Sequence, residues 1–103
     1  MIKVFICYKL KSGVTREQYR TWSREVDQPM AGRRPGVLVY RVWEIEGSGT
    51  EHEPFCDVME EIGVEAWADW EAVGTAPEMQ EVIRSFFALA DPNSLRVVYG
   101  GEV

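Results

Sequence analysis

The sequence has few of the residues on which common metal and nucleophile sites depend. Its 103 residues include one histidine and two cysteines, Cys7 and Cys56, which are far apart in the chain. It has no glycine-rich phosphate loop, no GxSxG motif and no HExxH motif. One histidine and two separated cysteines do not supply a transition-metal ligand set. We therefore expect no metal and no cofactor, so that any chemistry depends on side-chain acids and bases or on the ligand itself.

Positive charge is also scarce. Lysine and arginine total 11 against 17 aspartate and glutamate, which gives a net charge of -6. Phosphate backbones repel such a chain, so we expect no nucleic-acid partner. The arginine row formed by Arg16, Arg20 and Arg24 has helical spacing and fits a solvated helix face.

Long hydrophobic runs are missing. No apolar run approaches the roughly 18–20 residues that a membrane span needs. The apolar N-terminal run stops at Lys9, which is too short for a secretory signal. Cys7 and Cys56 lie in apolar runs and are expected to be buried free thiols. These features predict a cytoplasmic protein without a membrane partner.

Hydrophobic residues are plentiful, at 46% of the chain, and 12% of residues are aromatic. The length suits a single domain over residues 1–103. Apolar runs rich in β-forming residues predict strands over residues 2–10, 37–45, 55–62 and 95–99. We expect the acidic pair Glu60-Glu61 to mark the exposed end of the third strand.

Two capping-box patterns predict where helices begin. The box that starts at Thr15 opens a helix that we expect to end near Asp27, because Pro29 disfavours helix at the residue before it. Further helices are predicted over residues 64–73 and 75–90, and the second of these also starts with a capping box, Thr75-Ala-Pro-Glu78.

This order of elements predicts an α+β fold of the ferredoxin-like type, βαββαβ, in which a four-stranded antiparallel sheet carries helices on one face. The other face does not become cleanly polar: Phe5 and Cys7 lie on it, and residues 38–39 and 97–98 are apolar pairs. An exposed apolar patch of this kind is typical of an interface, so we expect a homodimer that closes an α/β barrel. A monomer with scattered apolar surface residues is the alternative.

The aromatic residues are candidates for the walls of a cavity between helices and sheet. Aromatic walls suit a flat, apolar, conjugated ligand, and ordinary core packing is the alternative. The candidate substrate-binding residues are Tyr8, Tyr19, Trp22, Trp67, Trp70 and Phe86.

Three side chains are candidates for proton transfer. His52 has a suitable pKa but lies between two glutamates, which also fits a solvated surface residue. Asp57 falls in an apolar strand, where a carboxylate is costly unless it is functional or paired, for example with Arg41. Asp27 lies at a helix C-terminus, where the helix dipole disfavours negative charge; a site role and loop hydrogen bonding are both open. Tyr40 is a candidate hydrogen-bond donor.

Several motifs resemble the EthD-like branch of the dimeric α/β-barrel superfamily, and within it the REDY-like, HapK-type proteins found with prodiginine pigment pathways. The motifs are Tyr19…Trp22…Val26-Asp27-Gln28-Pro29, Pro35-Gly36-Val37, Tyr40-Arg41-Val42, Asp57-Val58-Met59-Glu60 and Glu65-Ala66-Trp67. The resemblance implies a homodimer with a ligand cleft between sheet and helices in each subunit, and a substrate such as a bipyrrole or another fused heteroaromatic.

The superfamily includes cofactor-free monooxygenases, polyketide cyclases, decarboxylases and muconolactone isomerases. EthD-like proteins often have a histidine two residues before the proline that follows the first helix, and here that residue is Asp27. The resemblance therefore implies no histidine mechanism but makes Asp27 a candidate acid or base. In the cyclases an aromatic residue on the second helix shapes the pocket, a place that Trp70 or Trp67 would take.

Together these features predict a secondary-metabolism protein that binds a flat heteroaromatic intermediate. It would assist a proton-transfer step such as dehydration, tautomerisation or condensation, in which Asp27, Asp57 and His52 move protons and Tyr40 donates a hydrogen bond. A non-catalytic carrier of the intermediate, and a stress- or signal-related dimer with no small ligand, are the alternatives.

Overall fold

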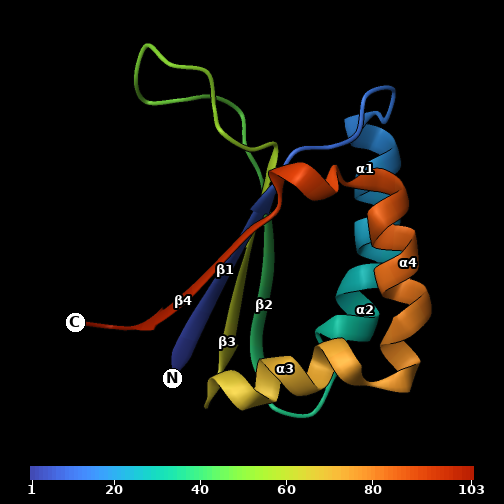
Figure 1. The fold of residues 1–103 in the computed structure, drawn as a ribbon, viewed down its shortest axis with the longest axis vertical. Helices are drawn as coiled ribbons and strands as arrows, with labels where there is room; N and C mark the ends of the chain where they lie inside the picture. Colours follow the sequence, from blue (N-terminus) through green and yellow to red (C-terminus); the bar gives the residue numbers. More distant parts are fainter.

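Four antiparallel strands form one sheet in the order β2-β3-β1-β4 in the computed structural model, which describes residues 1–103. All the helices lie on one side of this sheet (Figure 1). The predicted ferredoxin-like βαββαβ arrangement is thereby confirmed. The strands are β1 (Ile2–Tyr8), β2 (Val37–Glu44), β3 (Val58–Val64) and β4 (Arg96–Gly101).

The helical layer consists of short segments that follow one another closely. The first group is α1 (Arg16–Trp22), the π-helical turn η1 (Ser23–Asp27) and α2 (Gln28–Ala31). The second group is α3 (Trp67–Thr75), the 3-10 turn η2 (Pro77–Met79), α4 (Gln80–Leu89) and the 3-10 turn η3 (Pro92–Ser94). None of these helices is long and apolar enough to span a membrane.

The first capping box is present as predicted. The Gln18 amide N–H donates to Thr15 Oγ1 at 3.1 Å, and the Thr15 N–H donates to Gln18 Oε1 at 2.8 Å. Each side chain thus satisfies a backbone donor that has no partner within the helix.

The predicted end of this helix near Asp27 is wrong, because the chain stays helical to Ala31. The Gln28 N–H donates to the Ser23 carbonyl, five residues back, so the turn before Pro29 is wider than in an α-helix. A proline ring clashes with the carbonyl four residues before it in a regular α-helix. The wider turn gives the ring room, and it buries Asp27 at its last position.

Other predicted boundaries are also wrong, among them the helix predicted from residue 64, which begins at Trp67. Strand β3 begins at Val58, not at residue 55, and runs to Val64, so that Glu60 lies inside the strand and is not at its exposed end. Thr75 is the last residue of α3 and caps no helix start. Its hydroxyl instead lies 3.3 Å from the carbonyl oxygens of Glu71 and Ala72 and donates back into α3.

The core lies between the helices and the facing side of the sheet. Val4, Ile6 and Tyr8 of β1 alternate toward the helices and are buried, as predicted, beside Val58 and Ile62 of β3. No helix of the chain covers the opposite face of the sheet. This face carries the cross-strand pair Phe5 and Val98, which are 40% and 64% exposed. Trp43 of β2, paired with Met59, is on the same face and 53% exposed.

We expect Thr15→Ala to lower the free energy of unfolding by about 1 kcal/mol, because the Gln18 N–H at the start of α1 loses the hydroxyl that accepts its hydrogen bond. Urea denaturation followed by circular dichroism measures the change. Thr21→Ala, an exposed substitution inside α1, is the matched control and is expected to leave stability unchanged or slightly higher. Equal losses in the two variants would contradict the role of the cap.

Candidate functional site

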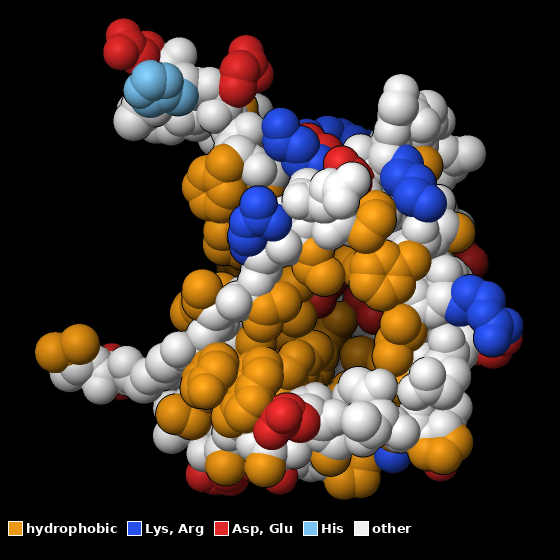
Figure 2. All heavy atoms as spheres, viewed as in Figure 1, with side chains coloured by type: hydrophobic (Ala, Val, Ile, Leu, Met, Phe, Trp, Pro, Cys, Tyr) orange, Lys and Arg blue, Asp and Glu red, His pale blue; other side chains and the backbone are white.

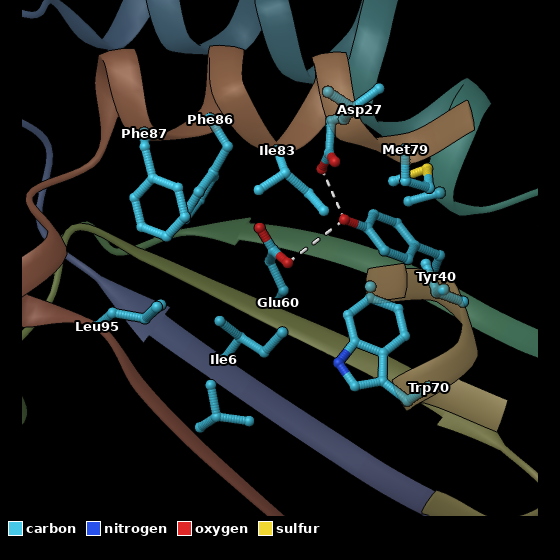
Figure 3. A pocket seen from close by; sticks show the side chains of 15 residues that line it. Ile6, Asp27, Tyr40, Glu60, Trp70, Met79, Ile83, Phe86, Phe87 and Leu95 are labelled. Carbon is cyan, nitrogen blue, oxygen red and sulfur yellow. Dashed lines mark hydrogen bonds between the residues drawn. The ribbon is translucent and has the colours of Figure 1, made fainter. Parts of the chain in front are cut away.

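A cavity of about 190 Å³ lies between the sheet and the helices. Twelve of its 15 lining residues are hydrophobic, which suits an apolar ligand. Trp70 of α3, Met79 of η2 and Phe86 of α4 form part of the helical wall, and Ile6 of β1 lies on the opposite side (Figure 3). In the space-filling view the hollow is rimmed by hydrophobic side chains and acidic atoms are visible inside it (Figure 2).

Three polar side chains meet in this apolar space: Asp27, Tyr40 and Glu60. The Tyr40 hydroxyl donates to Asp27 Oδ2 at 2.6 Å and lies 3.3 Å from Glu60 Oε1 (Figure 3). We call Asp27 and Glu60 the acid pair. They are only 6% and 4% exposed, and neither forms an ion pair.

The local structure explains how these three residues come together. Glu60 alternates with Val58 and Ile62 along β3, so it points to the helical side of the sheet. Tyr40 lies opposite Ile62 in the register of β2 with β3 and shares that face. Asp27 closes the π-helical turn and approaches the two strands from the helical layer. Three separate elements therefore supply one hydrogen-bonded group.

A second set of hydroxyl groups supports Glu60 from the side away from Tyr40. The Tyr8 hydroxyl donates to Glu60 Oε2 at 2.5 Å. The hydroxyls of Tyr8 and Tyr19 also form a hydrogen bond, and since Tyr8 gives its proton to Glu60, Tyr19 is the donor. Burial and the neighbouring carboxyl raise the pKa of both tyrosines, so both stay protonated donors.

Burial sets the protonation of the acid pair. Desolvation and the charge of Asp27 raise the pKa of Glu60 to about 8, although the hydrogen bonds from Tyr8 and Tyr40 oppose this shift. Desolvation also raises the pKa of Asp27 to about 6, opposed by the hydrogen bond from Tyr40. At neutral pH Glu60 therefore holds a proton and Asp27 is mostly ionised. An acid and a base thus stand on either side of the Tyr40 hydroxyl.

The structure brings some of the predicted residues to the cavity. Asp27, Tyr40, Trp70 and Phe86 line it. Tyr8 and Tyr19 do not reach its wall, because their hydroxyl groups are used behind Glu60.

Two predicted tryptophans lie elsewhere. Trp22 donates its indole N–H to Ser85 Oγ at 2.8 Å and packs against Phe86 with ring centroids 6.0 Å apart, but it is not part of the cavity wall. Trp67 stacks on Tyr99 of the edge strand β4, with ring centroids 4.1 Å apart. Neither lines the cavity, since each is occupied by another partner.

The other two candidate proton carriers are not in the cavity. Asp57 precedes β3, where its carboxylate accepts from the Leu10 N–H at 2.8 Å and lies 3.7 Å from Arg16. Pairing with Arg41, the structural alternative for Asp57, is wrong, because Arg41 lies opposite Glu61 in the sheet. His52 is exposed in the loop between β2 and β3, which projects away from the helical layer (Figure 1).

Glu60 is the residue of the site that the sequence reading missed. The signal was the alternation of Val58, Glu60, Ile62 and Val64, which places a carboxyl in an otherwise apolar row. No group of three or more histidine, cysteine, aspartate or glutamate side chains converges as a set of metal ligands. The arrangement can hold a ligand in an apolar space and exchange protons with it.

Comparison with known proteins identifies a family. The family model described as REDY-like protein HapK matches residues 2–101. No curated protein matches the sequence.

Solved structures share the fold at low sequence identity. HapK from Hahella chejuensis superposes with a TM-score of 0.80 at 14% identity, and the match covers 100% of this chain and 93% of that chain. An EthD-family protein from Bacillus halodurans matches with a TM-score of 0.76 at 17% identity, over 100% and 99% of the two chains. A protein from Thermobifida fusca described as dimeric and ferredoxin-like matches with a TM-score of 0.74 at 11% identity, over 98% and 90%.

The raised pKa values of the acid pair predict how stability depends on pH. The folded protein keeps protons that the unfolded chain loses above about pH 4, so this contribution to stability falls as the pH rises toward 8. Glu60→Gln mimics the protonated side chain and removes the Glu60 part of the loss. As the pH rises, we expect the free energy of unfolding of the variant to increase relative to that of the wild type. The increase is roughly 1.4 kcal/mol for each unit of pKa shift removed.

Urea denaturation at a fixed protein concentration, from about pH 4.5 to about pH 8.5, measures this difference. Glu71→Gln changes an exposed glutamate of α3 and is the matched control, expected to follow the wild type at every pH. Parallel curves for wild type and Glu60→Gln would show that Glu60 does not titrate in this range.

Proposed function

Because the chain belongs to the REDY-like HapK family, we propose that it binds a flat heteroaromatic intermediate of secondary metabolism and assists a proton-transfer step on it. The observation that carries this proposal is the acid pair inside an apolar cavity. The resemblance to proteins found with prodiginine pathways makes a bipyrrole or a related pigment precursor the substrate class that we favour.

The energetic cost of the acid pair supports a role in chemistry. Burying a carboxyl without a cation costs several kcal/mol unless the group is protonated or hydrogen-bonded. Folding alone would favour apolar side chains at these two positions, where Val58, Ile62 and Ala31 already lie nearby in the core. Two acids with separated pKa values are what an acid–base step near neutral pH requires.

The geometry suggests how protons would move. Ionised Asp27 would accept a proton from a C–H, N–H or O–H group of the ligand, and protonated Glu60 would give its proton to another ligand atom. Asp27 would then be protonated and Glu60 ionised. Tyr40 lies between them, so it can accept a proton from Asp27 while passing its own to Glu60, which restores the starting state. The same cycle serves tautomerisation, dehydration or condensation.

A non-catalytic carrier remains the second candidate, favoured by the hydrophobic character of 12 of the 15 lining residues. Binding and proton transfer are therefore measured separately. Pyrrole-2-carbaldehyde is expected to quench tryptophan fluorescence, because Trp70 lines the cavity. No quenching at millimolar concentration would reject both candidates.

Proton abstraction is tested with 5-nitrobenzisoxazole, a flat bicyclic compound that opens to a coloured product when a base removes its ring proton. We expect the protein to accelerate this reaction and Asp27→Asn to lower the rate by roughly 10²–10⁴-fold, the usual contribution of a positioned base. The surface substitution Glu71→Gln serves as the control with unchanged rate. Retained binding of the aldehyde with equal rates for wild type and Asp27→Asn would favour the carrier.

We further propose that the chain is a homodimer, as the Thermobifida fusca protein is described to be. The open face of the sheet, with Phe5, Trp43 and Val98 exposed, supports sheet-to-sheet association. Light scattering at micromolar concentration is expected to give twice the 11.8 kDa mass of one chain. Val98→Glu should shift the protein toward the monomer, because it places a charge in the contact.

Ala72→Glu is the control for that experiment, since it adds the same charge to an exposed position of α3 and should leave the dimer intact. A wild-type mass of one chain would contradict the dimer.

A further inference from the structure

We propose that the cavity recognises a cation: a flat ligand whose nitrogen carries a positive charge, such as a protonated nitrogen heteroaromatic or an iminium, held with its N–H toward the acid pair. The inference rests on the proposed function only in taking the cavity as the ligand site. It adds the charge of the ligand, which neither the family nor the fold specifies.

The first argument is the missing counter-charge. Asp27 and Glu60 are both more than nine-tenths buried, and every ion pair of the chain involves other acids. Asp27 uses Oδ2 for Tyr40, and no protein group donates to its Oδ1. A polar atom of this kind in a cavity wall is open to a donor from a ligand.

The second argument is that no neighbouring element supplies a positive group. The titratable groups facing the acid pair are Tyr8 on β1, Tyr19 on α1 and Tyr40 on β2. The cavity residues from α3, η2, α4 and β4 include no titratable side chain. A cationic ligand would therefore provide the only positive charge in the site, whereas an anion would meet two carboxyls and no positive group.

The third argument is the aromatic wall. Tyr40 and Trp70 lie with ring centroids 6.4 Å apart, and Phe86 and Phe87 with centroids 4.9 Å apart, all lining the same cavity. The face of an aromatic ring attracts a cation and stacks on a flat conjugated frame. An apolar ring system bearing one positive nitrogen matches both features, while a neutral hydrocarbon leaves the acid pair without a partner.

Recognition of a charged ligand also predicts that ligand binding is coupled to proton release by the two acids. A bound cation favours the ionised form of both carboxyls, so that Glu60 gives up its proton more readily near neutral pH: to an acceptor atom of the ligand in the proposed step, and to solvent when the cation has no such atom. The affinity for a cation should then rise with pH over the range in which Asp27 and Glu60 lose their protons, from about 6 to about 8.

The test uses three probes with one bicyclic frame: 1-naphthylmethylamine as the cation, 1-naphthylmethanol as the neutral form and 1-naphthoate as the anion. Isothermal titration calorimetry from about pH 5.5 to about pH 8.5 measures their affinities. At the upper pH we expect the amine to bind roughly tenfold or more tightly than the alcohol, and the naphthoate not at all. The amine affinity should rise with pH, by at most about tenfold per pH unit for one released proton, while the alcohol shows no trend.

Each outcome decides the inference. Equal affinities for amine and alcohol with no pH trend would overturn it and leave the apolar ligand site of the proposed function intact. Preference for the naphthoate would also overturn it. No binding by any of the three would reject both the inference and the ligand site.

Two variants, one for each acid, test whether the acid pair causes the preference for the cation. Asp27→Asn and Glu60→Gln should each lower the amine affinity roughly tenfold while they keep the affinity for the alcohol. Glu71→Gln removes one charge from the surface of α3 and should keep the full preference for the amine. Calorimetry of the wild-type protein in two buffers with different heats of ionisation counts the released proton, and a count of zero near neutral pH would contradict the inference.

Discussion

The hydrogen-bonded contact of Asp27, Tyr40 and Glu60 is the constraint on which the arrangement of the site depends. A carboxyl removed from water is tolerated only if donors reach it or it keeps its proton. Here the donors come from β2 and β1, through the hydroxyls of Tyr40 and Tyr8. The π-helical turn, the three strands β2, β3 and β1, and the chain of tyrosine hydroxyls must therefore keep their relative positions. Any movement between the helical layer and the sheet leaves a buried acid without its partner.

The wide turn before Pro29 connects helix geometry with the site. Proline removes one backbone donor and its ring needs space, and a turn closed over five residues provides that space without ending the helix. Buried residues follow one another at four-residue spacing along these helices, Tyr19, Ser23, Asp27 and Ala31, and a turn wider than 3.6 residues keeps this row on one face. Wide turns of this kind are frequently found at functional sites, and in this chain the turn carries the acid with the lower of the two raised pKa values.

The sequence was enough to predict the sheet, the order of elements and the first capping box, because alternation and capping are local signals. It was not enough for the site. The apolar residues Phe55 and Cys56 made β3 seem to begin three residues early, and this error turned Glu60 into an apparent strand end. The sequence also could not show which tryptophan lines the cavity. Trp22 and Trp67 have the same local pattern as Trp70 and differ only in their tertiary partners, Ser85 and Tyr99. Asp27 and Tyr40 were found, but their contact depends on a turn that proline seemed to forbid.

Glu60 and Glu61 show how strongly the register of one strand determines the chemistry. They are consecutive residues of the same type on opposite faces of β3. Glu60 lies between Ile6 and Val42, and burial raises its pKa. Glu61 lies on the open face, where a hydrogen bond from Lys3 at 2.8 Å lowers its pKa. A shift of the register by one residue would exchange the two faces, so that Glu61 would enter the core away from Lys3 and Glu60 would lie on the open face, without the burial that raises its pKa. The apolar residues that fix this register, Val58 and Ile62, therefore stabilise the fold and at the same time hold the acid in the cavity.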